Sequence, residues 1–224
     1  MIDLRDAIRT TGTVRAFTDD PVDDATLAAV LDDARFAPSG GNRQPWRVAI
    51  VRDAGVRSSI AALIQPVWDE YASIAARGAT PFALDAPPAP AERPHVANPL
   101  LDRIQQIPVV LAIAADRTKV ALMDGDLDRP ALTGGASVYP FCWNLLLAAR
   151  ARGLGGVLTT FLSRVEPAAV PVLGLPPAYA LAATVFLGHP VHQPTRLRRA
   201  PVADFATVDR FDGPAFAGME EVGS

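Results

Sequence analysis

Hydrophobic positions change their spacing several times along the chain, and each change predicts a new secondary-structure element. From Asp24 to Phe36 the apolar residues recur every three or four positions, which is the spacing of one helix face. Asp23 or Asp24 offers an N-cap to this helix, and Pro38 ends it. The β-branched run from Arg47 to Val51 is bounded by polar residues and predicts a strand.

The later hydrophobic runs predict that the chain continues to switch between helix and strand. We expect a helix at the N-terminus, a long helix over residues 55–76 that bends at Pro66, and a helix over 138–151 that ends at Gly153. Continuous apolar runs at 107–115 and 180–187 predict buried strands, and a short helix precedes the second run.

Two segments have little periodicity. Residues 78–99 contain six prolines and few regularly spaced apolar residues, which predicts an irregular excursion or lid rather than a domain boundary. The tail over 190–224 is also weakly periodic, and a tail of this kind either wraps a partner subunit or is disordered. We find no internal repeat and expect a single domain over residues 1–224.

Composition narrows the class of protein. With 224 residues, of which 50% are hydrophobic and 20% charged, the chain can bury its own core or share one with a partner. A net charge of -3 without a dominant basic stripe argues against nucleic-acid binding. The single cysteine, Cys142, precludes an intrachain disulfide and lies in an apolar helical run, so we expect a buried thiol rather than a nucleophile.

Several features argue against a membrane or metal site. Three of the first six residues, Asp3, Arg5 and Asp6, carry charge where the apolar core of a targeting signal would begin, and we expect a cytoplasmic protein. The most apolar stretch, 168–188, is interrupted by Pro and Gly and predicts no membrane span. The three histidines are too scattered to predict a metal site.

The loop over 37–46 concentrates glycines and hydrogen-bonding side chains between a predicted helix and a predicted strand. Its two glycines allow a close backbone approach, and Ser39, Asn42 and Gln44 offer donors and acceptors. Two interpretations stay open from these residues alone: a binding loop for a flat, polar-edged ligand, or a connection whose side chains satisfy their own backbone.

Two further clusters have the chemistry of a phosphate site. The segment 10–15 combines three threonine hydroxyls, a glycine and Arg15, and a second segment holds Arg196, Arg198 and Arg199. Hydroxyls and guanidinium groups together are a common means of binding phosphate. Each cluster alone is equally typical of a protein surface.

Two other glycine patterns do not predict a known site. The sequence over 153–156 lacks the G-x-G-x-x-G spacing and follows a helix, so it predicts a helix-capping turn rather than a dinucleotide fingerprint. The sequence over 135–139 lacks the last glycine of a nucleophile elbow, which makes a hydrolase a weak interpretation.

Four motifs occur in order along the chain. They are T-V-R-A-F at 13–17 with P-V at 21–22, A-P-S-G-G-N-R-Q-P-W at 37–46, N-L-L-L-A-A at 144–149 with G-L-G at 153–155, and L-T-T at 158–160 with the basic residues before Pro201. They resemble the R-R-S-V-R-x-F, A-P-S-x-x-N-x-Q-P-W and N-L-L-L-A-A…G-L-G motifs and the flavin-contacting segments of the nitroreductase family. The resemblance covers about residues 8–205.

The resemblance implies an α+β fold of three layers, with a mixed, mainly antiparallel sheet flanked by helices, in an intertwined homodimer that binds FMN at the subunit interface. It also implies a set of cofactor contacts. Thr13 and Arg15 would meet the ribityl chain, phosphate or ring edge; Pro38, Ser39 and Gly40, supported by Asn42, would contact the isoalloxazine from the same or the opposite subunit; Leu158, Thr159 and Thr160 would lie against the ring near its reactive nitrogen; and Arg198 and Arg199 would neutralise the phosphate.

One departure from the family pattern concerns the phosphate. The two arginines that begin the family's R-R-S triplet are replaced by Thr11 and Gly12. Loss of a charge-assisted hydrogen bond costs about 1.5–3 kcal/mol, so we expect weaker FMN binding unless Arg9 or the C-terminal arginines compensate.

The family implies an activity in which the cofactor supplies the redox chemistry and no catalytic acid or base is required. NADH or NADPH would reduce FMN and leave, and a small acceptor such as a nitroaromatic or quinone would then be reduced in a ping-pong cycle. Tyr139, Phe141 and Trp143, or residues of the 78–99 excursion, would line the acceptor face, unless the three aromatics pack in the core. The alternatives are a reduced deazaflavin donor, and a non-catalytic protein that binds or sequesters flavin.

Overall fold

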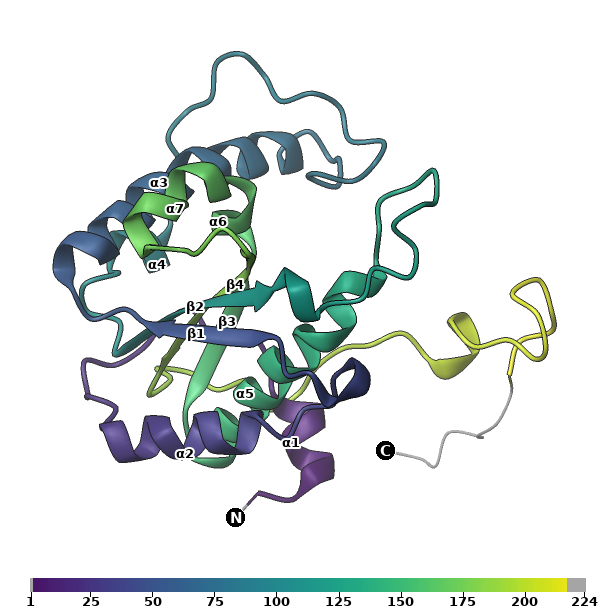
Figure 1. Cartoon of the computed structure of the whole chain (residues 1–224), viewed down its shortest axis with the longest axis horizontal. Helices are drawn as coiled ribbons and strands as arrows, with labels where there is room; N and C mark the ends of the chain where they lie inside the picture. The colour runs from purple at the N-terminus through teal and green to yellow at the C-terminus, as the bar shows by residue number, and fades with distance from the viewer. Residues whose placement is uncertain (1, 217–224) are drawn as a thin grey trace.

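The computed structural model describes residues 2–216 and places helices on both sides of one sheet (Figure 1). The helices are α1 (Leu4–Thr10), α2 (Asp24–Ala34), α3 (Ala54–Ala75), α4 (Pro99–Asp102), α5 (Tyr139–Ala151), α6 (Phe161–Arg164) and α7 (Glu166–Leu173). The strands are β1 (Trp46–Ile50), β2 (Val109–Asp116), β3 (Gly155–Thr159) and β4 (Tyr179–Gly188).

The sheet has the strand order β1-β2-β4-β3, and each pair of neighbouring strands is antiparallel. The sheet is therefore antiparallel, and the expectation of a mixed sheet is corrected. Among the described residues, parallel pairing is limited to one isolated bridge between Thr13 and Gly156. A register shift between Ile113 and Ala114 interrupts the pairing of β2 with β4.

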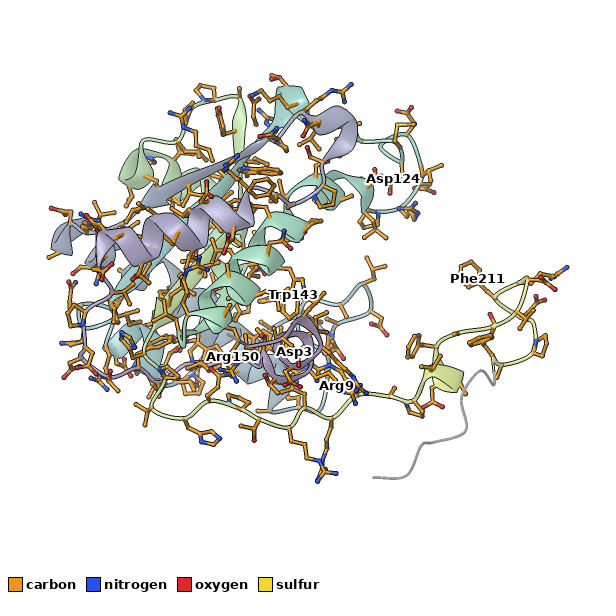
Figure 2. All side chains as sticks on the ribbon, turned by 90° about the horizontal axis from the view of Figure 1, so that it is seen from below. Asp3, Arg9, Asp124, Trp143, Arg150 and Phe211 are labelled. Atoms are coloured by element: carbon orange, nitrogen blue, oxygen red, sulfur yellow. The ribbon has the colours of Figure 1, made fainter. Side chains whose placement is uncertain are left out.

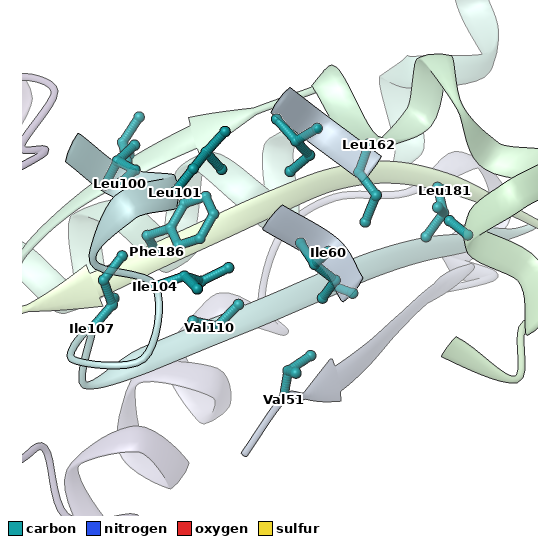
Figure 3. Close-up of a cluster of buried hydrophobic side chains, with 14 of the residues drawn as sticks. Val51, Ile60, Leu100, Leu101, Ile104, Ile107, Val110, Leu162, Leu181 and Phe186 are labelled. Atoms are coloured by element: carbon teal, nitrogen blue, oxygen red, sulfur yellow. The ribbon is translucent and has the colours of Figure 1, made fainter. Parts of the chain in front are cut away.

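Two apolar cores, one on each face of the sheet, hold the three layers together. One lies under α3, α4, α6 and α7 and includes Ile60, Ile64 and Phe186 (Figure 3). The other lies under α2 and α5 and includes Val30, Leu145 and Leu187. Because successive residues of a strand point to opposite faces, Phe186 and Leu187 of β4 enter different cores.

Aspartate N-caps fix the starts of α2 and α3, the helices that precede and follow β1 in the sequence. The carboxylate of Asp23 accepts from the N–H of Thr26 at 2.6 Å, which selects Asp23 over Asp24 as the cap of α2. Asp53 accepts from the N–H of Val56 at 2.9 Å at the start of α3, which remains one helix through Pro66.

The predicted helices and strands occur within two residues of their expected bounds, but β3 and the short helices α4 and α6 were not predicted. Two glycines begin β3, and glycine has little intrinsic preference for strands. The strand forms because its backbone pairs with β4 along Gly155–Thr159. The predicted capping turn is present between α5 and β3, where Gly153 has φ of 78°.

The proline-rich excursion contains neither helix nor strand between α3 and α4 and arches over α3 (Figure 1). Its last residues are tied to that helix by Val96, whose N–H donates to Asp69 Oδ1 at 2.9 Å and whose carbonyl accepts from Gln65 Nε2 at 3.0 Å. The excursion therefore returns to the helix that it leaves.

The C-terminal segment first follows the N-terminal turn and then leaves the body. Backbone hydrogen bonds join Thr18 to His189 and Val191 to Ala16. Residues 201–216 then extend outward (Figure 1), and Phe211 lies far from the helices (Figure 2). Residues 217–224 of the predicted tail lie outside the described residues. Within residues 2–216, no helix combines the length and apolar character needed to cross a membrane.

Candidate functional site

A cavity of about 860 Å³ lies between the β3 side of the sheet and the layer formed by α3, α4 and α6. Five of the residues proposed from the sequence line it: Thr13, Arg15, Leu158, Thr159 and Thr160. The rest of the wall comes from α3, α4, α6 and the excursion, which contributes Pro81, Phe82 and Asn98. Cavities of roughly 300–1,000 Å³ are typical of small-molecule and cofactor sites.

Two glycines at the start of β3 bring the N-terminal turn to this cavity. The N–H of Val14 donates to the carbonyl of Gly156 at 2.9 Å, and a Cβ on Gly155 would lie 2.7 Å from a methyl of Val14. Only glycine permits this approach at position 155, so Gly155 lets Thr13 pair with Gly156 and places Thr13 and Arg15 alongside β3.

Buried polar atoms without partners occur in three residues of the cavity wall. They are Thr159 Oγ1, Ser163 Oγ and Trp68 Nε1, none of which has a hydrogen-bond partner among residues 2–216. Buried polar groups in folded proteins almost always have partners, and leaving one unsatisfied costs about 1–3 kcal/mol. A polar-edged ligand is one source of the missing partners.

An aromatic cluster, defined by Trp68, Tyr71, Phe82 and Phe161, forms the wall opposite the sheet. Trp68 stacks on Tyr71 with ring centroids 5.7 Å apart, and Phe161 meets both rings edge-on. Phe82, from the excursion, lies 6.1 Å from Tyr71. The excursion that carries Phe82 was expected near the site, whereas Trp68 and Tyr71 were not predicted, although they are three residues apart on one helix face.

The charged side chains of the described cavity wall are Arg15 and Arg164, and both are cations. Arg164 donates to Glu70 Oε1 at 2.8 Å and lies over the ring of Phe82, 4.0 Å from its centroid. The other oxygen of Glu70 accepts from Arg93 at 3.3 Å, so one carboxylate serves two guanidinium groups. The wall therefore has a positive electrostatic balance.

The loop with the most specific motif lies outside this cavity. Within one chain, Pro38, Ser39, Gly40 and Asn42 do not line it. The loop is nevertheless ordered by its own contacts: Ser39 Oγ accepts from the N–H of Gln44, and Ser137 Oγ accepts from the N–H of Gly40, each at 3.0 Å.

Three residues of this loop have left-handed backbones, which accounts for part of its composition. Gly41, Asn42 and Gln44 have φ of 59°, 54° and 48°. Asparagine tolerates this region better than most residues, and its Oδ1 accepts from Gln44 Nε2 at 3.0 Å. Pro38 and Gly40 remain exposed, so the loop presents a preformed surface.

The C-terminal arginines lie on the segment that follows the N-terminal turn. Leu197 and Pro194 pack so closely on Gly12 that a Cβ there would come within 2.9 Å of Leu197. Arg198 and Arg199 come directly after this contact and are exposed; neither lines the cavity. The contact explains a glycine at position 12, where the family motif has arginine.

Tyr139, Phe141 and Trp143 of α5 do not line the cavity of one chain. The excursion, the other segment that the sequence offered for the acceptor face, lines it through Pro81 and Phe82. Phe141 is buried and stacks on Trp46 at 5.0 Å, whereas Tyr139 and Trp143 remain 44% and 41% exposed. Core packing, which was the other interpretation of these aromatics, therefore holds for Phe141. Tyr139 and Trp143 do not pack in the core of one chain.

Cys142 is fully buried in the same helix, and burial raises the pKa of its thiol to about 12. This agrees with a core thiol rather than a nucleophile. In residues 2–216 no group of three or more histidine, cysteine or carboxylate side chains is placed to hold a metal ion.

Comparison with known proteins identifies the fold and the family. The model of the Nitroreductase family matches residues 8–189. A 5,6-dimethylbenzimidazole synthase of Rhodospirillum rubrum is 33% identical over 192 residues, covering 82% of each chain, and an NADH dehydrogenase of Thermus thermophilus is 30% identical over 205 residues, covering 90% of this chain and 94% of the other.

Solved structures share the fold at lower identity. The NADPH:FMN oxidoreductase of Vibrio harveyi, complexed with NAD+, has a TM-score of 0.66 and 20% identity, covering 92% of this chain and 76% of the other. A structure from Desulfovibrio desulfuricans that is described as a nitroreductase in complex with FMN also has a TM-score of 0.66, with 22% identity over 92% and 95% of the chains. From the match over residues 8–189, this chain belongs to the nitroreductase family of flavin oxidoreductases.

Proposed function

We propose that the protein is an FMN-dependent oxidoreductase that passes reducing equivalents from NADH or NADPH to a small aromatic or quinone acceptor. The observation that supports this proposal most directly is the 860 Å³ cavity, which collects Thr13, Arg15 and the end of β3. These residues come from two distant parts of the sequence, and both parts belong to motifs of the family.

The cavity has the chemistry that a flavin requires. An isoalloxazine is a flat ring with polar atoms along one edge, and the wall offers apolar surface beside the unpartnered Thr159 hydroxyl. Arg15 adds a cation at the same wall. We therefore assign Thr13, Arg15, Leu158, Thr159 and Thr160 to cofactor binding, and we assign no catalytic acid, base or metal.

When bound, FMN would supply the redox chemistry of the reaction. For a nitroaromatic acceptor, NAD(P)H and one proton convert the nitro group to a nitroso group, with release of NAD(P)+ and water. The chain's own residues would orient the donor and acceptor and exclude solvent. Trp68, Tyr71 and Phe161 would provide the apolar wall for that purpose.

We further propose a homodimer in which the exposed loop of one subunit completes the cofactor site of the other. Pro38, Ser39, Gly40 and Asn42 are held in an ordered loop but do not reach the cavity of their own chain. An isoalloxazine that contacts the cavity residues of one subunit and the loop of the other would then lie at the subunit interface.

The phosphate would be bound by Arg198 and Arg199. Because Leu197 packs against Gly12, these guanidinium groups follow the same turn that lacks the family's leading arginines. We expect Arg199→Ala to weaken FMN binding roughly 10- to 100-fold, which corresponds to one charge-assisted hydrogen bond. Flavin fluorescence titration measures the change, and an unaltered Kd would show that the phosphate lies elsewhere.

The visible spectrum and one reduction assay test the proposed function. We expect purified protein to be yellow, to be bleached anaerobically by NADH or NADPH, and to be reoxidised by a quinone. Protein that takes up no FMN would contradict the proposal.

The same assays separate the alternatives. Flavin that binds but is reduced by neither nicotinamide would favour a sequestering protein, and reduction only by a reduced deazaflavin would identify that donor. Since a 5,6-dimethylbenzimidazole synthase is among the relatives, mass spectrometry of the products for 5,6-dimethylbenzimidazole tests a synthase activity as well.

A further inference from the structure

We infer that the acceptor is a planar aromatic compound with a carboxylate or a similar anionic group, and that Arg164 selects it through that charge. This inference rests on the proposed function, because it names the class of acceptor for the same cavity. It assigns a specificity role to a residue outside the four sequence motifs.

Arg164 has hydrogen-bond donors that the described residues do not use. A guanidinium group has five N–H donors, and in the described structure Arg164 uses one of them, toward Glu70 Oε1 at 2.8 Å. The side chain is 47% exposed and lines the cavity. Donors therefore remain free to bind a carboxylate, with which a guanidinium forms paired hydrogen bonds.

Positive charge exceeds negative charge around Arg164. Glu70 is shared with Arg93, whose Nη1 lies 3.3 Å from Glu70 Oε2, so its one negative charge faces two positive charges. No carboxylate lines the cavity among residues 2–216, and its other charged residue is Arg15. An anionic ligand would offset this excess of positive charge in a partly desolvated space.

Arg164 lies against the aromatic cluster. Its guanidinium lies 4.0 Å from the centroid of Phe82, and Phe161 is on the same short helix one turn earlier. The Glu70 pair and the Phe82 contact hold the group beside the rings of Trp68 and Tyr71. A ligand ring in contact with the cluster would bring its substituent to Arg164.

The reaction remains balanced for such an acceptor. With 4-nitrobenzoate, two electrons and two protons from NAD(P)H and solvent convert the nitro group to nitroso with release of water, and the carboxylate is unchanged. Its function is binding alone, so the amide 4-nitrobenzamide is a neutral analogue of nearly the same shape.

The test compares kcat/KM for these two acceptors in FMN-loaded protein. The intrinsic reactivity of each acceptor is the same for every variant, so a change in the ratio of kcat/KM values reports the protein's contribution. We expect Arg164→Gln to lower the carboxylate-to-amide ratio at least about tenfold, and Arg164→Lys to retain part of it because the charge remains. Higher ionic strength should lower the ratio of the unmodified protein.

Arg52→Gln is the matched control, since it removes one arginine that pairs with Asp24 at the surface, outside the cavity. Its ratio should equal that of the unmodified protein. An unchanged ratio in Arg164→Gln would overturn the inference. The inference would also be overturned if Arg164→Gln bound FMN more weakly, or lost a preference between NADPH and NADH, while the carboxylate-to-amide ratio stayed intact. In that case Arg164 would bind a phosphate.

A binding measurement separates failure of this inference from failure of the proposed function. Titration of the oxidised protein with 4-nitrobenzoate, followed by tryptophan fluorescence quenching, requires no turnover. Tighter binding of the carboxylate than of the amide, lost in Arg164→Gln, would support the anionic site even if NADH and NADPH failed to reduce the flavin. Equal binding of the two compounds would contradict it.

Discussion

At the scale of single residues, Gly155 controls whether the N-terminal turn can reach the cavity. A Cβ at this position would lie 2.7–3.0 Å from three atoms of Val14, a buried side chain that cannot move freely. We expect Gly155→Ala to displace Thr13 and Arg15 from the end of β3 and to weaken FMN binding.

The rescue variant distinguishes this steric mechanism from a general loss of stability. Val14→Gly combined with Gly155→Ala removes all three contacting atoms, Cβ included, and should regain part of the affinity that Gly155→Ala loses. Flavin fluorescence titration of both variants measures the difference. Affinity that stays low in the double variant would show that Gly155 acts in another way.

The ionisation of the Cys142 thiol reports whether this residue of α5 is buried. The folded-state pKa of about 12 exceeds the ordinary value near 8.5, so stability is unaffected below about pH 8.5 and falls as the pH rises toward 12. We expect no reaction with a thiol reagent at pH 8 until denaturant is added. Urea unfolding at pH 8 and pH 10 should show an alkaline loss that is smaller in Cys142→Ala, and a fast native-state reaction would contradict the buried position.

At the scale of elements, one buried arginine joins the end of β1, the start of α3 and the loop before β2. Arg57 is 8% exposed and donates to the carbonyls of Val51, Ile104 and Ile107 at 2.8–3.1 Å. We expect Arg57→Met to lower the free energy of unfolding by about 1–3 kcal/mol for each carbonyl left without a donor. The exposed Arg52→Gln should change it by less than about 1 kcal/mol in the same urea titration, and equal effects would show that the buried bonds contribute little.

The elements also show which parts of the fold were predictable from local sequence. The helix from Asp24 and the strand at 107–115 were predicted within two residues because their apolar spacing is local. β3 was not, because its glycines matter through contacts with Val14 and β4, which are distant in the sequence. The same limit applies to the cavity: Thr13 and Thr159 belong to recognisable motifs, whereas Arg164 and Phe161 reach it only because α3 and α6 pack together over the sheet.

At the scale of the whole molecule, residues 201–216, here called the arm, expose apolar side chains that a single chain leaves uncovered. Val202, Phe205, Val208, Phe211 and Phe216 are each at least 40% exposed, and Phe211 projects from the body (Figure 2). Monomeric proteins seldom expose large apolar patches. We expect a second copy of the chain to cover these residues in the proposed homodimer.

This dimer should depend on the apolar residues of the arm. We expect the full chain to sediment at twice the 23.7 kDa of one subunit. The dimer of the double variant Phe205→Ser, Phe211→Ser should dissociate at a higher protein concentration. The reason is that burial of apolar surface stabilises an interface by about 25 cal/mol per Å², and the variant has less apolar surface to bury. Asp209→Asn on the same arm is the control. If FMN lies at the interface, dilution of the double variant should release flavin in parallel with dissociation. Unmodified protein that is monomeric and still retains FMN would exclude a cofactor site shared between subunits. A double variant whose dimer is unaltered would exclude only the role of the arm in the interface.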